Sequence, residues 1–472
     1  MIEWLPLVEG EGSFTVPPLA ARAAHQPDLP ETFQTSWLRC CKMSETAITT
    51  NPLVLQGYDC VDIQESDDEI AVRLRMPPPV ACEECHAVGR LVKNGARDIP
   101  FPDLPVHEKP VTVWVDRQRF MCKACGCTFR QSLPEISDHY RMTARLECHI
   151  RAEVFNTTNQ ALANRFRLPE RTIRDLFDDE LEKRDKAYVP AAPRFIGIDE
   201  LFLGRKYRCI ITNLEERSLV DMLETRNKLP VMEYLQKLRN ADKIEIASMD
   251  MWGPYRQAFH EVLPDVVIVV DKFHVTRMAN EALEDVRKAL REELTQKEVR
   301  ALKGDRKVLL KREADLSPQE VLLMSGWVNN YEPLKTAYGL KENFFKIWDD
   351  SKSSTEAKER LEAWRASIPE SQEDYWSDLV KASKNWETEI LAYFQYGKHI
   401  TNATTESMNR RIRDLNRDGR GYSFKALRGK MLFGHPHKIV VFGGRKSPFM
   451  RDSFGMGIPQ IVDYGVDLST SE

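Results

Sequence analysis

Residues 244–274 read IEIASMDMWGPYRQAFHEVLPDVVIVVDKFH, and this stretch decides the fold of the central part of the chain. Two short apolar runs, 244–248 and 266–270, have the composition of buried strands. The residues between them, 255–262, have the spacing of an amphipathic helix. A strand, a helix and a second strand in this order are typical of a sheet covered by helices.

The pattern extends in both directions. Upstream, strands are expected at 195–198, 207–212 and 218–223, followed by a helix at about 230–240. The resulting order, β-β-β-α-β-α-β, predicts a mixed sheet with helical covers. Downstream, residues 275–395 have the pattern of long, charged, amphipathic helices without a strand signal, which predicts an all-helical domain inserted into the α/β core.

Acidic residues follow the expected strands. Asp199 closes the strand expected at 195–198 and Asp250 closes the one expected at 244–248, and adjacent strand ends would bring their carboxylates within a few ångströms of each other. Such hard oxygen ligands favour Mg²⁺ or Mn²⁺ over zinc, and two cations about 3.5–4 Å apart suit in-line attack at phosphorus. Glu406 is the expected third carboxylate, on a helix that Thr404 or Thr405 could cap.

Two neighbouring residues compete for a place in this site. Asp271 also ends a strand and could replace Asp250 as the second ligand, with His274 close behind it. Asp250 is preferred because it follows the fourth strand and Asp271 follows the fifth. Two further acids at strand ends, Glu200 and Asp221, are expected to be solvated.

The net charge of -4 conceals one strongly basic tract. Residues 402–450 hold 11 Lys and Arg against 3 Asp and Glu, with Tyr422, Phe424 and Phe433 among the interleaved aromatic residues. Such a tract indicates a polyanionic partner. An acid at the head of a cationic helix is well placed to meet phosphates. The arginines expected to contact DNA there are Arg410, Arg411 and Arg413.

Five of the ten cysteines lie between Cys82 and Cys127. Two C-x2-C pairs in this region can surround one Zn²⁺ tetrahedrally, because each short turn aims two sulfurs at one point. Gly126 suits the tight turn after the second pair. Cys127 competes with Cys125 for the fourth position. The expected zinc ligands are Cys82, Cys85, Cys122 and Cys125.

Residues 157–177 predict two short helices packed across a tight turn, which is the pattern of a helix-turn-helix. The second helix would begin near Pro169. Its first turns would expose residues at the positions where a recognition helix meets the major groove. The residues expected to contact DNA are Arg171, Thr172 and Arg174.

Length and composition narrow the class of protein. A chain of 472 residues holds two or three domains, and no apolar run approaches the roughly 18 residues of a membrane span. Few cysteines, half of them clustered, indicate a reducing compartment and a cytosolic protein. A disordered leader is expected at 1–42 and a flexible tail at 451–472.

The chain resembles the bacterial insertion-sequence DDE transposases of the ISL-three type. The resemblance covers roughly residues 80–435 and rests on the runs GIDE (197–200), SMDMWGPY (248–255), VDKFH (270–274) with ANEA (279–282), and Thr401-Asn402 through Glu406 to Asn409. It implies a zinc-binding domain, a helix-turn-helix and an RNase H-like core interrupted by a helical insertion. It also implies Mg²⁺-dependent strand cleavage and transfer at the ends of a mobile element.

Asp199, Asp250 and Glu406 match the family's acidic triad, and Asp271 and His274 match a characteristic motif without an assigned task. The implied partners are double-stranded DNA, as terminal repeats and target, and a second copy of the chain or a larger assembly, because two element ends need two active sites. No membrane is implied. Such a protein would act in the bacterial cytoplasm, associated with the nucleoid.

The expected domains follow from these assignments. They are a zinc-binding domain at 43–135, a helix-turn-helix at 136–188, the first part of the core at 194–274, the helical insertion at 275–395, and the last part of the core with its basic helix at 396–450. Two rival functions remain: a DNA-binding regulator derived from a transposase that lacks catalysis, and a nuclease that cuts without joining.

Overall fold

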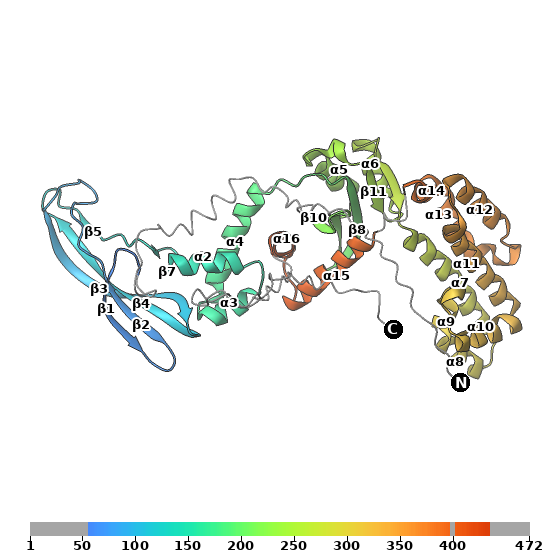
Figure 1. The fold of residues 1–472 in the computed structure, drawn as a ribbon, viewed down its shortest axis with the longest axis horizontal. Helices are drawn as coiled ribbons and strands as arrows, with labels where there is room; N and C mark the ends of the chain where they lie inside the picture. The colour runs from blue at the N-terminus through green and yellow to red at the C-terminus, as the bar shows by residue number, and fades with distance from the viewer. Residues whose placement is uncertain (1–54, 397–401, 435–472) are drawn as a thin grey trace, which may run out of the picture. The chain divides into compact units, whose positions relative to one another are not determined.

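The computed structural model describes residues 55–396 and 402–434, and Figure 1 shows its ribbon. The expected leader at 1–42, the expected tail at 451–472 and part of the last core segment lie outside these residues. The chain divides into two compact units, Met1–Cys148 and His149–Glu472. Each unit is described in turn.

The first unit is built on a five-stranded sheet in which β1, β2, β4 and β3 lie side by side and β5 pairs with β4. A two-stranded sheet of β6 and β7 follows it. The elements are β1 (Asp59–Glu65), β2 (Ile70–Arg75), β3 (Leu91–Val106), β4 (Lys109–Cys122), β5 (Thr128–Arg130), β6 (Ile136–Ser137) and β7 (Met142–Thr143). Helix α2 (Ala144–Glu153) spans the boundary between the units.

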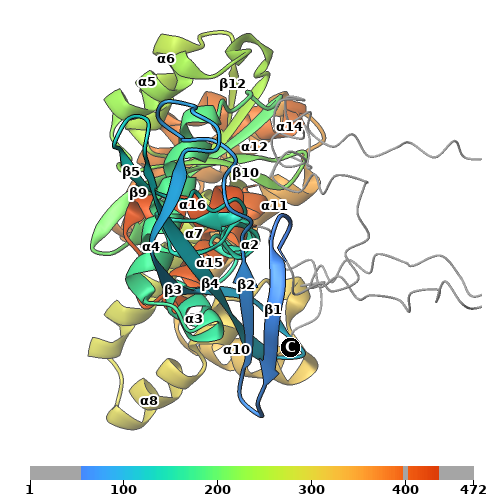
Figure 2. The ribbon, with the colours of Figure 1, turned by 90° about the vertical axis from the view of Figure 1, so that its left-hand side faces the viewer.

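Alternation of apolar and polar residues explains the main sheet. Ile70, Val72 and Leu74 of β2 are buried, whereas Arg73 and Arg75, which alternate with them, point outward. The same period of two continues on β4, which pairs with β2 in parallel. One face of the sheet is therefore a hydrophobic core and the other faces solvent. Figures 1 and 2 show β3 and β4 as long neighbouring strands.

The second unit starts with helices and continues into the predicted sheet. Its elements are α3 (Asn159–Phe166), α4 (Glu170–Ala187), β8 (Phe195–Leu203), β9 (Lys206–Asn213), β10 (Ser218–Leu223), α5 (Lys228–Lys237), β11 (Ile246–Met249), α6 (Gly253–Val262), β12 (Val267–Val270), α7 (Lys272–Ala289), α8 (Gln296–Gly304), α9 (Arg306–Leu310), α10 (Pro318–Asn330), α11 (Glu332–Asp350), α12 (Ser354–Ala366), α13 (Glu373–Asn385), α14 (Glu387–Tyr396), α15 (Ala403–Asp418) and α16 (Phe424–Phe433). Single-turn 3-10 helices lie at Ala241–Lys243, Leu290–Glu292, Glu313–Asp315 and Glu370–Gln372.

The strands of this sheet lie in the order β10-β9-β8-β11-β12. The first three are antiparallel neighbours, whereas β8, β11 and β12 are parallel. The β-β-β-α-β-α-β order and the mixed sheet expected from the sequence are therefore present. Because β8, β11 and β12 are parallel, their carboxyl ends meet at one edge of the sheet.

Helices cover both faces of the sheet, as Figures 1 and 2 show for α5, α6 and α15. Ile196 and Ile198 of β8 join α5 and α6 in one apolar cluster. On the opposite face, Leu201 packs with Met408 and Ile412 of α15. The second cluster therefore holds α15 against β8, the middle strand of the sheet.

A glycine allows α15 to approach so closely. A Cβ atom at Gly197 would lie 2.5 Å from the Oγ1 atoms of both Thr212 and Thr405. The two threonines, buried on β9 and α15, share a hydrogen bond of 2.7 Å. The helix is therefore held to the sheet by a polar contact as well as by apolar packing.

Helices α7 to α14 lie between β12 and α15 in the sequence and contain no strand, as expected for 275–395. They enclose a hydrophobic core of their own, rich in aromatic residues that include Phe344, Trp364 and Trp376. This core also includes Val269 and Val270 of β12. The insertion is therefore packed onto the edge of the sheet.

Candidate active site and zinc site

Three aspartates lie in a row at the carboxyl ends of the parallel strands. Met249 of β11 pairs with Ile198 of β8 and with Val270 of β12. The next residue in each strand direction is an aspartate, so strand register alone places Asp199, Asp250 and Asp271 side by side. One detail of the sequence interpretation was wrong: β8 continues to Leu203, so Asp199 lies within the strand and not at its end.

Asp199 is only 6% exposed, and its Oδ2 atom accepts a hydrogen bond of 2.7 Å from Nδ2 of Asn409 on α15. Its Oδ1 atom accepts one from the backbone N–H of Glu200. Burial, together with the negative charge of Asp250, raises the pKa of Asp199 to about 7. This carboxyl group is therefore poised to exchange a proton for a cation near neutral pH.

His274, in the first turn of α7, lies against Asp250 with 2.6 Å between Nε2 and Oδ1. Burial lowers the pKa of His274, but the hydrogen bond to Asp250 and the charges of the three aspartates outweigh burial and raise it above its ordinary value. The imidazolium form is thus favoured while the carboxylates lack another cation.

Asp271 caps α7 and also reaches α15. Its Oδ1 accepts a 3.0 Å hydrogen bond from the backbone N–H of Phe273, and its Oδ2 accepts one of 3.0 Å from that of Asn402. Burial raises the pKa of Asp271. Asp271 therefore joins the start of the helical insertion to the residue that precedes α15.

Glu406 lies in the first turn of α15 and is exposed. One ligand atom each from Asp271, His274 and Glu406 lie within 4.8 Å of one another. The expected cap was wrong: the helix starts at Ala403, with Asn402 as its N-cap residue, and Thr405 is buried against Thr212. The five predicted residues thus form one continuous cluster, from Asp199 through Asp250 and His274 to Asp271 and Glu406.

The donor set of this cluster fits hard divalent cations. Four carboxylates supply the oxygen ligands that Mg²⁺ and Mn²⁺ prefer, and one imidazole lies among them. Asp199 and Asp250 contact each other directly, although their like charges repel. Such an arrangement of acids is costly unless a proton or a cation neutralises it.

Sequence reasoning missed two polar residues of the site. Asn409 was noted only as the last residue of a family motif, although it lies three residues after Glu406 and therefore next to it on the surface of the same helix. Asn402 was noted only in a motif, and its backbone N–H binds Asp271. The helical spacing could have indicated Asn409, whereas no local pattern predicts a contact between residues 131 positions apart.

The thermal stability of the second unit should depend on pH, and so should the gain in stability on adding Mg²⁺. The pKa of Asp199 is about 7 in the folded chain but roughly 4 in an unfolded one, so the folded chain binds the extra proton between these values. Stability therefore falls as pH rises through this window, and the raised pKa of His274 acts in the same direction. We expect a lower melting temperature at pH 8 than at pH 6 in magnesium-free buffer, and a larger gain on adding Mg²⁺ at pH 8.

Each kcal/mol of change in the free energy of unfolding should shift the melting temperature by about 2–4 °C. The matched variant is Asp199→Asn, which removes the titrating group and should reduce both differences. An unchanged pH profile in that variant would contradict the assignment of the shifted proton to Asp199. Differential scanning calorimetry of both proteins provides the measurement.

The exposed face of α15 is basic. Arg410, Arg411 and Arg413 are exposed and form no ion pair among residues 55–396 and 402–434. Glu406, Arg410, Arg413 and Arg417 follow helical spacing along one face. The predicted cationic helix headed by an acid is therefore present.

The predicted helix pair is also present. Thr158 caps α3, and Arg167 ends it in the left-handed conformation with φ of 52°. In the first turn of α4, the side chain of Arg171 is 90% exposed, Thr172 is half-buried, and Arg174 forms an ion pair of 2.6 Å with Glu170. Helices α3 and α4 thus have the short-turn arrangement expected, with the three predicted residues on the first turns of the second helix.

The first unit brings the predicted thiols together. The Sγ atoms of Cys82, Cys85, Cys122 and Cys125 lie within 4.8 Å of one another. Cys127 is close by, at 3.3 Å from Cys82 and 3.1 Å from Cys125 between sulfurs. Gly126 has φ of 73°, as the tight turn requires. Backbone N–H groups lower the pKa of Cys82 to about 6, which favours the thiolate that a metal binds.

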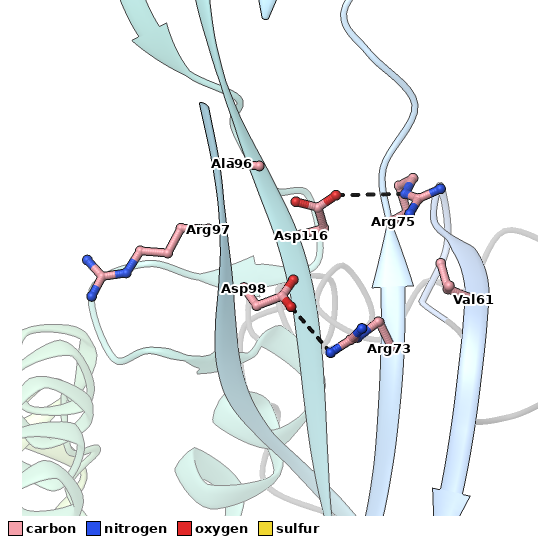
Figure 3. A pocket seen from close by; sticks show the side chains of 7 residues that line it. All are labelled: Val61, Arg73, Arg75, Ala96, Arg97, Asp98 and Asp116. Atoms are coloured by element: carbon pink, nitrogen blue, oxygen red, sulfur yellow. Dashed lines mark ion pairs between the residues drawn. The ribbon is translucent and has the colours of Figure 1, made fainter. Parts of the chain in front are cut away.

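A shallow hollow on the sheet of the first unit carries no comparable chemistry. Figure 3 shows its lining side chains, in which Arg73 pairs with Asp98 at 3.3 Å and Arg75 with Asp116 at 3.8 Å. These pairs largely neutralise its charge. Within the described residues, no helix has both the length and the apolar character needed to span a membrane.

Comparison with known proteins agrees with this geometry. A family model described as a transposase, of the DDE type in the ISL-three group, matches residues 196–431. A second, described as the zinc-finger of transposase IS204/IS1001/IS1096/IS1165, matches residues 78–125. The second match and the cluster of four thiols together indicate that this part of the chain binds zinc.

Two curated relatives are named as transposases. The transposase for insertion sequence element IS1001 of Bordetella parapertussis is 24% identical over 387 residues, which cover 78% of this chain and 92% of that protein. The transposase for insertion sequence element IS1557 of Mycobacterium tuberculosis is 26% identical over 274 residues, or 51% of this chain and 61% of that protein. Because the first family match spans half of the chain, this protein belongs to the ISL-three family of insertion-sequence DDE transposases.

Proposed function

We propose that the chain cuts and joins DNA phosphodiesters at the ends of an insertion sequence, with Asp199, Asp250 and Glu406 as the catalytic acids. The observation that supports this most directly is the row of three aspartates with Glu406 at the head of a basic helix. The strand order β10-β9-β8-β11-β12, with one acid within the first strand in sequence and another directly after the fourth, supports an RNase H-like core as part of this proposal.

The three acids would hold two Mg²⁺ or Mn²⁺ ions. Such ions, when bound, activate water and then a freed 3′-hydroxyl for attack at phosphorus. Other residues of the chain orient the carboxylates that would hold these ions. Asn409 holds one oxygen of Asp199 and leaves the carboxylate in a fixed orientation, while His274 keeps Asp250 in place through their ion pair. We assign Asp271 and His274 to positioning of the acids and of α15.

The DNA would be bound by two parts of the chain. Arg410, Arg411 and Arg413 would contact the phosphates next to the cut, which would make binding strongly salt-dependent. The first turn of α4, with Arg171, Thr172 and Arg174, would contact the terminal repeat as a helix-turn-helix does. The domain limits expected from the sequence are part of this proposal, as is a dimer or larger assembly that joins two ends.

Incubation of the protein with Mg²⁺ and duplexes that carry the ends of its own element tests the proposal. Nicked strands mapped at nucleotide resolution at the element ends, followed by a joined product, would support it. Cut ends without a joined product would indicate a nuclease. Binding without any cut would indicate a regulator, and the presence of all three acids in one cluster argues against that alternative.

Replacing Asn409 by alanine should lower the cleavage rate by about 10- to 100-fold, the usual range for residues that orient metal ligands. The reason is that Asp199 would lose the contact that holds its Oδ2 atom. Single-turnover cleavage provides the measurement. DNA affinity should stay unchanged, and Ser407→Ala on the same helix should cleave like the wild type. Equal rates for both variants would contradict the positioning role.

A further inference from the structure

Helix α16 connects the helix pair α3–α4 to the catalytic sheet, and one arginine contacts both. The Nε and Nη2 atoms of Arg428 donate to the two carboxylate oxygens of Asp221 on β10, at 2.6 and 3.0 Å. Its Nη1 atom donates to Asp185 near the end of α4, at 2.7 Å. Asp221, which was expected to be solvated, is instead only 4% exposed. That expectation was wrong because the partner lies 207 residues away.

A second cation on the same helix binds the start of the helix pair. Lys430 is 4% exposed, and its Nζ atom donates to the carbonyl oxygens of Val154 and Thr157 at 2.6 and 2.7 Å. These carbonyls follow the end of α2 and precede the cap of α3. A buried ammonium group without such acceptors would be strongly unfavourable, so this contact resists opening.

Close packing completes the connection. A Cβ atom at Gly429 would lie 2.4 Å from Leu181 of α4, so the two helices touch through the backbone of α16. The ring of Phe433 lies 5.6 Å from those of Phe155 and Tyr188. Leu427 of the same helix belongs to the apolar cluster that contains Leu201, two residues after Asp199 on β8, and Met408 of α15. Charged and apolar contacts thus run from α4 through α16 to β8 and α15, the two elements that carry Asp199 and Glu406.

We propose that α16 holds the helix pair at a fixed distance from the catalytic acids, so that DNA is cut at a set number of base pairs from the sequence that α4 binds. Arg428 is the central positioning residue of this connection. The inference rests on the proposed function and adds to it the means by which the cut site is chosen. A helix pair joined to the core only through residues 188–194 would allow a range of distances, and therefore a range of cut sites.

The Asp185→Asn variant tests this inference. It removes the charge that joins Arg428 to α4, while Asp221 still satisfies the guanidinium group. Glu182→Gln is the matched control, because Glu182 lies on the same helix, is 61% exposed at its side chain and pairs only with Lys186 among the described residues. Asp185→Glu, which keeps the carboxylate, serves as the rescue variant.

The measurement combines nuclease footprinting with nucleotide-resolution mapping of cuts on a duplex that carries one end of the element. Wild type, Glu182→Gln and Asp185→Glu should cut at one position relative to the footprint. Asp185→Asn should show the same footprint but cuts spread over neighbouring nucleotides, with total cleavage reduced by no more than a few-fold. A change that merely destabilised the fold would lower all cutting and leave its position unchanged.

Two outcomes would overturn the inference. A single sharp cut by Asp185→Asn, at the wild-type position, would show that Arg428 does not set the distance, while the proposed function would stand. A wild-type protein that binds the duplex and never cuts it would overturn the proposed function, and the inference with it. A duplex with one extra base pair between the footprint and the cut site provides a second readout. The wild-type protein should still cut at the same number of base pairs from the footprint, and therefore at a different nucleotide of the element.

Discussion

Replacement of Asp250 by asparagine is expected to abolish DNA cleavage, with a loss of at least about a thousandfold in single-turnover rate. Asp250 lies between Asp199 and Asp271 in the row of acids and contacts both Asp199 and His274. The amide that replaces it carries no negative charge and provides only one oxygen, so a pair of cations cannot be held as before. Affinity for the element ends should change little, because the DNA contacts are assigned to residues of α4 and to the arginines of α15.

Two further variants test whether the loss of cleavage is specific to Asp250. Asp265→Asn, in the exposed turn before β12, removes an equal charge from the same strand–helix–strand stretch and should cleave normally. Asp271→Asn should retain measurable cleavage, because Asp271 bonds backbone N–H groups of Phe273 and Asn402 and orients α15. If cleavage persists in Asp250→Asn and disappears only in Asp271→Asn, then Asp271 is the second catalytic acid.

Removal of zinc is expected to unfold the zinc-binding part of the first unit. Structural zinc contributes an apparent free energy of about 10–16 kcal/mol in small zinc-binding peptides. Here the ligands come from two turns that flank the β3–β4 hairpin, so the metal joins both ends of that hairpin. Dialysis against a strong chelator should release one zinc ion per chain, measured by atomic absorption. Hydrogen exchange should then become fast at residues 82–127 and stay slow in β8.

Cysteine variants separate the ligands from their neighbour. Cys82→Ser should lose zinc and fold poorly, whereas Cys127→Ser should keep zinc with full stoichiometry. The reason is that Cys82, Cys85, Cys122 and Cys125 form the group within coordination reach of one point. Loss of zinc in Cys127→Ser, with retention in Cys125→Ser, would instead make Cys127 the fourth ligand.

Much of the catalytic unit was predictable from local sequence. Short apolar runs separated by amphipathic stretches specified the β-β-β-α-β-α-β order, because buried strands and surface helices differ in period. The positions of Asp199 and Asp250 followed from that order. The first unit was less predictable: β3 contains Pro100, Pro102 and Pro105, which weaken the strand signal, yet it forms a 16-residue strand paired with β4.

The residues that support the acids were harder to predict, since their contacts join distant parts of the chain. Thr405 was interpreted as a helix cap, yet it is buried because Gly197 leaves room for it beside Thr212. Asp221 was interpreted as solvated, yet it is buried against Arg428. In both cases the local pattern is ordinary, and only the folded arrangement shows which polar groups meet.

The helical insertion begins and ends at almost the same point, because Asp271, before α7, bonds the backbone of Asn402, before α15. The free energy of closing such a loop grows only slowly with its length. Evolution could therefore lengthen, shorten or exchange the whole segment as a cassette while the acids stay in place. We therefore expect chimaeric proteins joined at these two residues to exchange the whole helical segment and leave the acids in place.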